Sequence, residues 1–227
     1  MKRFWTEVTV ADRGIALDGK PVRTPGRVPL LLPTDALAEA VADEWRAVEG
    51  TLDPRRMPLT GLANAAIDRI APDPLTFAAG LARYGDSDLL YYRAEAPPPL
   101  IARQAAAWDP PLAWAARRYD VHFDVTAGVV PIAQPEPTVT RLAEAIATRD
   151  GWVLAALSPI VTITGSLILA LALAERAMTP DAVWDAAMID EAWQIECWGE
   201  DSLAAAATAA RRIDYDAANA FMVAATE

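Results

Sequence analysis

Residues 183–199 read VWDAAMIDEAWQIECWG, and this stretch has the periodicity of an amphipathic helix. Thr179-Pro180-Asp181, just before it, supplies a capping hydroxyl, a proline for the first helical position and a carboxylate for the first turn. Gly199 is a typical stop signal. The sequence therefore predicts one helix that begins near Pro180 and ends at Trp198.

The apolar residues of this helix form a stripe. At about 100° per residue, four large apolar side chains fall within roughly 40° of one axis. They are Trp184, Met188, Ile195 and Trp198. We expect this stripe to face the rest of the protein, and Glu191 lies in the middle of it.

A carboxylate such as Glu191 on an apolar stripe must be hydrogen-bonded, paired with a cation, raised in pKa, or exposed where the stripe meets another molecule. Two interpretations are open: an internal pair with an arginine or a helix end, and a site for a partner or substrate. Trp193 lies on the opposite side, about 180° from the stripe. A contact surface and a helix packed on two faces explain Trp193 equally well.

Composition and charge narrow the functional class. The 227 residues are 53% hydrophobic, enough for a substantial core in one or two domains. The net charge of −11 argues against nucleic acid or an anionic membrane surface as a partner. A single cysteine, Cys197, excludes an intramolecular disulfide and a cysteine-rich metal site, so we expect a reducing compartment. The first residues give no sign of a secretion signal.

The first part of the chain has the pattern of a small β-containing domain. Short alternating strands are predicted over residues 4–32, with a hairpin turn at Asp18-Gly19. A helix should begin at Pro33-Thr34, with Trp45 as its apolar anchor, and a second should run from about 61 to 70. We place this N-terminal β-rich domain, with one or two helices, at residues 1–72.

The remainder, residues 73–227, is predicted to form a larger C-terminal all-α helical bundle, which makes the fold class α+β. Helices are expected over 75–84, over 100–118 with an interruption at residues 108–111, and from 138 onward. Residues 88–93 fit either a short strand or a helical turn. Residues 121–125 alternate as a short strand.

Residues 151–174 carry no charge and are long enough to span a bilayer. Ser158-Pro159 and Gly165-Ser166 interrupt the apolar run, however, and the flanking charges show no positive bias. We therefore predict the central helix of a soluble helical domain, without membrane insertion.

Residue types needed for familiar catalysis are sparse. Catalysis by a Ser-His-Asp or Cys-His group would depend on His122, the one histidine, which is predicted to be exposed on a strand. No phosphate-binding glycine loop, dinucleotide motif or metal-ligand spacing occurs, so no cofactor or metal is expected. Carboxylate chemistry remains, and a soluble hydrolase using Asp88, Asp109 or Glu191 is the alternative function.

Several short motifs, taken in order, resemble one known family. They are Phe4-Trp5, residues 17–25 (LDGKPVRTP), Pro33-Thr34, Glu44-Trp45, residues 57–60 (MPLT), residues 88–90 (DLL), Gln104, residues 108–110 (WDP), Gly165-Ser166 and residues 194–199 (QIECWG). The ordered set is similar to the assembly chaperones that attend the α subunit of the F-type ATP synthase catalytic head. The similarity covers nearly the whole chain.

The resemblance implies a non-enzymatic protein that binds unassembled α subunit and prevents its aggregation until α pairs with β. It implies no small-molecule substrate, and a bacterial cytoplasmic location, or the mitochondrial matrix for a mature eukaryotic chain. The important C-terminal glutamate of the family falls on Glu191. We assign partner binding to Glu191, Gln194, Trp198 and Trp193, and we regard Trp45, Asp88, Trp108 and Asp109 as structural or of uncertain role.

Overall fold

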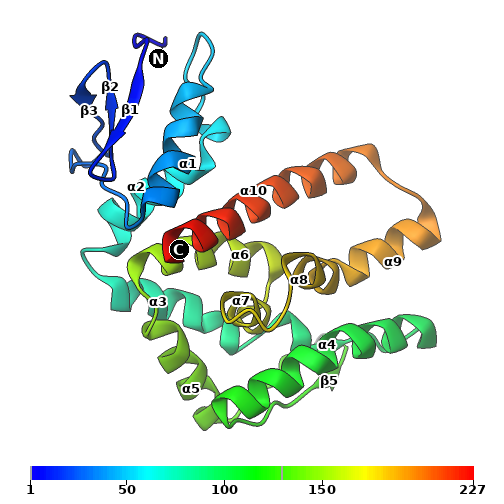
Figure 1. The fold of residues 1–227 in the computed structure, drawn as a ribbon. Coiled ribbons are helices and arrows are strands. Elements are labelled where there is room, and N and C mark those ends of the chain that lie inside the picture. Colours follow the sequence, from blue (N-terminus) through cyan, green and yellow to red (C-terminus); the bar gives the residue numbers. More distant parts are fainter. Residues whose placement is uncertain (1, 129) are drawn as a thin grey trace. The chain divides into compact units, whose positions relative to one another are not determined.

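A computed structural model describes residues 2–128 and 130–227. The chain forms two compact units. The first takes the segment up to Pro74 together with Asp150–Pro159 and Asp214–Glu227, and the second takes Leu75–Arg149 and Ile160–Ile213. A small antiparallel sheet precedes a mostly helical remainder, so the predicted α+β class is confirmed (Figure 1).

The sheet of the first unit has three strands in the order β1-β2-β3. They are β1 (Val8–Ala11), β2 (Gly14–Leu17) and β3 (Lys20–Pro21), and all pairings are antiparallel. Asp18 and Gly19 join β2 to β3 with φ values of 47° and 76°. Aspartate and glycine tolerate this left-handed backbone, which explains why the predicted hairpin turn forms there.

Helices cover this sheet. Thr34 caps α1 (Asp35–Arg46) by accepting a hydrogen bond from the backbone N–H of Leu37 at 3.1 Å. A 3₁₀ turn, η1 (Pro54–Arg56), leads to α2 (Pro58–Ala65) and a π-helical turn, η2 (Ala66–Ile70). The carboxylate of Glu44 accepts from the backbone N–H groups of Leu59 and Thr60, each at 2.7 Å, and so caps α2.

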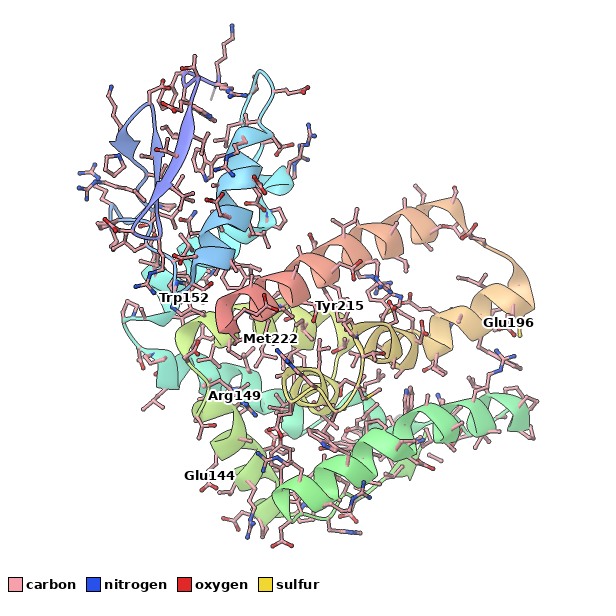
Figure 2. The ribbon with its side chains drawn as sticks, viewed as in Figure 1. Glu144, Arg149, Trp152, Glu196, Tyr215 and Met222 are labelled. Atoms are coloured by element: carbon pink, nitrogen blue, oxygen red, sulfur yellow. The ribbon has the colours of Figure 1, made fainter. Side chains whose placement is uncertain are left out.

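The core beneath the sheet is built around Trp5, which is only 3% exposed. Trp45 is partly buried against it, with ring centroids 5.4 Å apart, and the Trp5 indole N–H donates to the Trp45 carbonyl at 3.3 Å. Trp45 therefore does connect α1 to the β region, but Trp5 is the more deeply buried anchor. The rings of Trp152 (labelled in Figure 2) and Phe221, from the later segments of this unit, have centroids 6.2 Å apart and are tilted by 32° to each other.

The second unit is mainly helical. Its elements before residue 150 are α3 (Pro74–Ala82), η3 (Arg83–Gly85), η4 (Leu89–Tyr91), β4 (Tyr92–Arg93), α4 (Pro98–Tyr119), β5 (Thr126–Ala127) and α5 (Glu136–Ala147). After α6 (Gly151–Thr164) come α7 (Leu167–Ala174), α8 (Pro180–Ala187), α9 (Ile189–Trp198) and α10 (Ser202–Thr226). Helices α6 and α10 each contribute residues to both units.

The apolar run at 151–174 forms two helices, α6 and α7, instead of one. Gly165 has a φ of 67°, and the hydroxyl of Ser166 caps α7 by accepting from the N–H of Leu169 at 3.0 Å. Residues Leu167 to Ala172 are completely buried, in agreement with the interior position predicted. Within residues 2–128 and 130–227, no helix is long and apolar enough to cross a membrane.

Three local predictions need correction or completion. Helix α4 continues through Pro110 and Pro111 where an interruption was expected, because Trp108 and Leu112 on either side are buried and hold the segment in place. Residues 121–125 form no strand; only Thr126–Ala127 pair, in parallel with Tyr92–Arg93. Residues 88–93 contain both alternatives, the turn η4 followed by β4.

Candidate functional site

The predicted single helix at 180–198 is two helices, α8 and α9, separated at Met188, which has φ −99° and ψ 11°. The indole N–H of Trp108 donates to the carbonyl of Ala186 at 2.7 Å. In a continuous helix this carbonyl would accept from residue 190. The buried indole therefore satisfies an acceptor of the last turn of α8 and favours the break.

The break divides the apolar stripe into a buried half and an exposed half. Trp184 and Met188 are 9% and 8% exposed, as the stripe predicts. Ile195 and Trp198 are 45% and 78% exposed, so the prediction that they face the protein's own core is wrong. Every residue of α9 is at least partly exposed. Helix α9 is therefore a surface helix that carries exposed apolar side chains.

Glu191 lies at the start of this exposed face and forms an ion pair with α10. Nη2 of Arg211 donates to both carboxylate oxygens, at 2.9 and 2.7 Å, and the Thr208 hydroxyl donates at 3.3 Å. The two charged side chains are 42% and 38% exposed. Of the two interpretations of Glu191, the internal pair with an arginine is therefore present. A pair this exposed contributes only about 0–1 kcal/mol to stability.

The other side of α9 is attached to α4. Arg103 pairs with Glu196 at 2.6 Å and places its guanidinium 4.9 Å from the centre of the Trp193 ring. Gln104 donates to Asp190 at 2.7 Å. Trp193 is therefore half-buried beneath an arginine of α4, as expected for a helix packed on two faces.

The charged residues that α9 and the following turn themselves carry are all of one sign. Every charged residue between Ile189 and Ala210 is acidic, namely Asp190, Glu191, Glu196, Glu200 and Asp201. Glu196 lies near the end of α9 (Figure 2). Gln194 and Leu203 are also exposed, the latter by 81%. We call Glu191, Gln194, Ile195, Trp198 and Leu203 the α9 surface.

The remaining predicted residues have structural surroundings. Asp88 is completely buried and accepts from the backbone N–H groups of Leu90 and Ile168, both at 3.0 Å, which ties η4 to the first turn of α7. Burial raises the pKa of Asp88 from 3.8 to about 6. Trp108 is buried. The neighbouring Asp109 is exposed and pairs with Arg93 at 2.8 Å.

Asp88, Asp109 and Glu191 lie on different elements, and each has its own hydrogen-bond or ion-pair partner. His122 and Cys197 are both exposed. The described residues contain no group of histidine, cysteine, aspartate and glutamate side chains suited to holding a metal ion.

The sequence did not predict the roles of Arg211, Thr208 and Arg103, whose side chains contact α9 on its two sides. A signal for Arg211 was present, because Arg211 and Arg212 are the only basic residues after Arg176. Two arginines in an otherwise acidic segment would be expected to meet nearby carboxylates.

Comparison with known proteins adds independent information. The family model described as ATP12 chaperone protein matches residues 2–116. The crystal structure of Atp12 from Paracoccus denitrificans superposes with a TM-score of 0.91 at 40% identity, covering 99% of this chain and 98% of that one. The crystal structure of the Atu1473 protein from Agrobacterium tumefaciens gives a TM-score of 0.93 at 41% identity, covering 98% and 85%.

Proposed function

Because this chain belongs to the ATP12 chaperone family, we propose that it binds the unassembled α subunit of the F-type ATP synthase catalytic head and prevents its aggregation until α pairs with β. The role is non-enzymatic and requires no cofactor, nucleic acid or membrane insertion. The proposed location is the bacterial cytoplasm, or the mitochondrial matrix for a mature eukaryotic chain.

The observation that carries this proposal is the exposure of Trp198, at 78%, with Ile195 one turn before it at 45%. Large apolar side chains grouped on a surface helix are typical of protein interaction sites. The net charge of −11 keeps copies of the chaperone apart while this apolar surface is uncovered.

Four residues of the α9 surface have distinct proposed roles. Trp198 and Ile195 bury apolar area against the client, and Gln194 beside them supplies an amide donor and acceptor. Glu191 exchanges its half-exposed pair with Arg211 for a cation or backbone donors of the client. Trp193, covered by Arg103, forms the edge of the surface.

The alternative, a carboxylate-dependent hydrolase, needs an acid and a base at one solvent-accessible site. Asp88 is completely buried, while Asp109 and Glu191 are paired with different arginines. The positions of these three carboxylates therefore do not favour hydrolysis over client binding.

The proposal is tested by diluting denatured α subunit into buffer with and without this protein and following light scattering. We expect scattering by α to fall at a one-to-one ratio, and scattering by separately diluted β to stay unchanged. Equal aggregation of α with and without the protein would contradict the proposal.

A further inference from the structure

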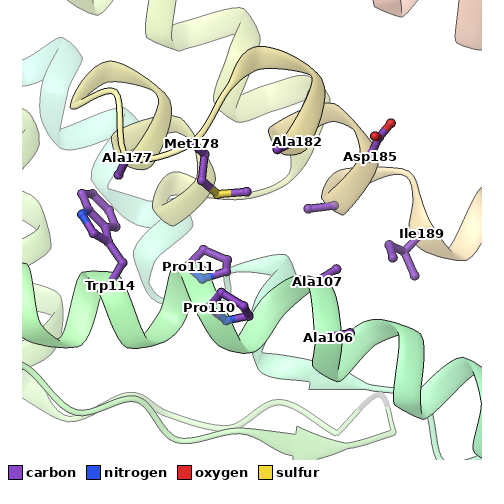
Figure 3. A pocket seen from close by; sticks show the side chains of 11 residues that line it. Ala106, Ala107, Pro110, Pro111, Trp114, Ala177, Met178, Ala182, Asp185 and Ile189 are labelled. Atoms are coloured by element: carbon purple, nitrogen blue, oxygen red, sulfur yellow. The ribbon is translucent and has the colours of Figure 1, made fainter.

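The second unit contains an open groove with a volume of about 440 Å³ between α4 and α8. Figure 3 shows Met178 facing Pro111 across it, with Trp114 toward one end and Asp185 at the rim of the other end, its carboxylate directed away from α4. Its lining is alanine, proline, methionine, isoleucine and tryptophan, and Asp185 is the one charged residue of that lining. An apolar groove with a single carboxylate suits an occupant that is apolar and carries a positive charge.

The α4 wall of the groove is interrupted in its backbone hydrogen bonding by two prolines. Ala106, Ala107, Pro110 and Pro111 all line it. Proline has no backbone N–H, so Pro110 and Pro111 cannot donate to the carbonyls of Ala106 and Ala107, the acceptors four residues earlier. The carbonyls of Ala106 and Ala107 therefore lack the donors that a regular helix would supply.

Asp185 differs from its acidic neighbours on α8 and α9. Asp181 pairs with Arg212 at 2.5 Å, and Asp190 accepts from Gln104 at 2.7 Å. Asp185 is exposed, and its side chain has no hydrogen bond or ion pair among the described residues. Its charge is thus available to a cation from another molecule.

We propose that this groove binds a segment of the client polypeptide in which an arginine is flanked by apolar residues, an inference that rests on the proposed chaperone function. The apolar side chains pack between Trp114 and Met178, and the guanidinium pairs with Asp185. Arginine suits the groove because its planar head has several N–H donors for carboxylate and carbonyl oxygens. A second copy of this acidic chain would bring mostly like charge to Asp185.

Two substitutions distinguish the contribution of the Asp185 charge from that of the shape of the groove. Asp185→Asn removes the charge and keeps the size, and Ala182→Phe fills the groove from an exposed position on α8. Glu144→Gln, an exposed neutralisation on α5, is the matched control. Melting curves of all variants establish that they are folded.

Binding of isolated α subunit is measured by titration at low and moderate salt. We expect about tenfold weaker binding for Asp185→Asn at low salt, with a smaller loss at moderate salt, because a desolvated charge pair is worth about 1.4 kcal/mol or more. Ala182→Phe should weaken binding at both salt concentrations, and Glu144→Gln should bind normally. Binding by both groove variants within twofold of wild type would overturn the proposal and leave the chaperone function standing.

A second measurement does not depend on the α subunit. The peptide acetyl-Gly-Leu-Arg-Leu-Gly-amide is titrated while the indole N–H resonance of Trp114 is followed, with a glutamine-for-arginine peptide as control. The arginine peptide should shift this resonance in wild type and bind at least fivefold more weakly to Asp185→Asn. No shift, or equal binding of both peptides, would overturn the groove proposal. If the arginine peptide alone shifts the Trp114 resonance but the protein does not bind α, the proposed function is refuted and the groove proposal stands.

Tight binding of wild-type chains to each other, lost in Ala182→Phe, would identify a second copy as the occupant and also overturn the proposal. Sedimentation at increasing protein concentration measures this.

Discussion

Trp108 on α4 donates its indole N–H to the carbonyl of Ala186 at the end of α8, and this buried hydrogen bond accompanies the change of direction into α9. A tryptophan of the core thus contacts the chain at the point where the exposed helix α9 begins. Up to Met188 the apolar stripe is buried, and beyond it the stripe is uncovered.

Trp108→Phe should test this relationship. Phenylalanine keeps an aromatic ring but leaves the buried Ala186 carbonyl without a donor, which costs about 1–3 kcal/mol of unfolding free energy. We expect a lower melting temperature and weaker α binding even under conditions where the variant is fully folded. A folded Trp108→Phe protein with wild-type affinity for α would show that the hydrogen bond does not position α9.

Glu191→Gln removes the charge and keeps the size of the side chain. Because the pair with Arg211 is half-exposed, its loss should change the unfolding free energy by no more than about 1 kcal/mol, a shift of a few degrees. Binding of α should nevertheless weaken clearly. Melting and α titration on the same preparation distinguish the two roles, with Glu144→Gln as control. A binding defect that tracks only the unfolded fraction would assign Glu191 to stability.

Truncation of the two N-terminal tryptophans should have unequal effects. Trp5→Ala removes a nearly completely buried side chain and should cost about 3–5 kcal/mol. Trp45→Ala removes a partly buried one and should cost less, although it also uncovers Trp5. Denaturant unfolding of both variants measures the difference. Equal costs, or no cost for Trp5→Ala, would contradict the packing described for the first unit.

Asp88 predicts a specific pH dependence. Burial raises its folded pKa to about 6 from an ordinary 3.8, so the folded state binds the proton more strongly than the unfolded state. Its contribution to stability is therefore complete below about pH 4 and is lost as the pH rises toward about 6, by about 2–3 kcal/mol. Unfolding of wild type and of the non-titrating Asp88→Asn should be compared across this range. The advantage of wild type should shrink with rising pH, and a constant or growing advantage would contradict the raised pKa.

Local sequence signals predicted much of the fold. Asp18-Gly19 specified a turn through backbone preference, Thr34 specified a helix start through its hydroxyl, and Gly165-Ser166 limited the apolar run at 151–174. In each case the deciding interaction lies within a few residues of the signal.

Features set by distant partners could not be read in the same way. The break at Met188 lies beside a hydrogen bond from Trp108, far away in the chain, and Ile195 and Trp198 beyond the break are exposed. Helical periodicity identified Glu191 as unusual, but it could not tell that Arg211 would be the partner. The unpaired state of Asp185 likewise becomes visible only once the partners of its neighbours are known.

Co-purification with Trp198→Ser shows whether the α9 surface selectively holds the α subunit. Wild type and variant are each immobilised and mixed separately with isolated α and isolated β. Trp198 is 78% exposed, so its replacement should leave the melting temperature nearly unchanged. We predict that wild type retains α and not β, and that folded Trp198→Ser loses most of the α. Equal retention of α by both proteins would show that Trp198 does not bind α, and retention of β to the same extent as α by wild type would show that binding is not selective.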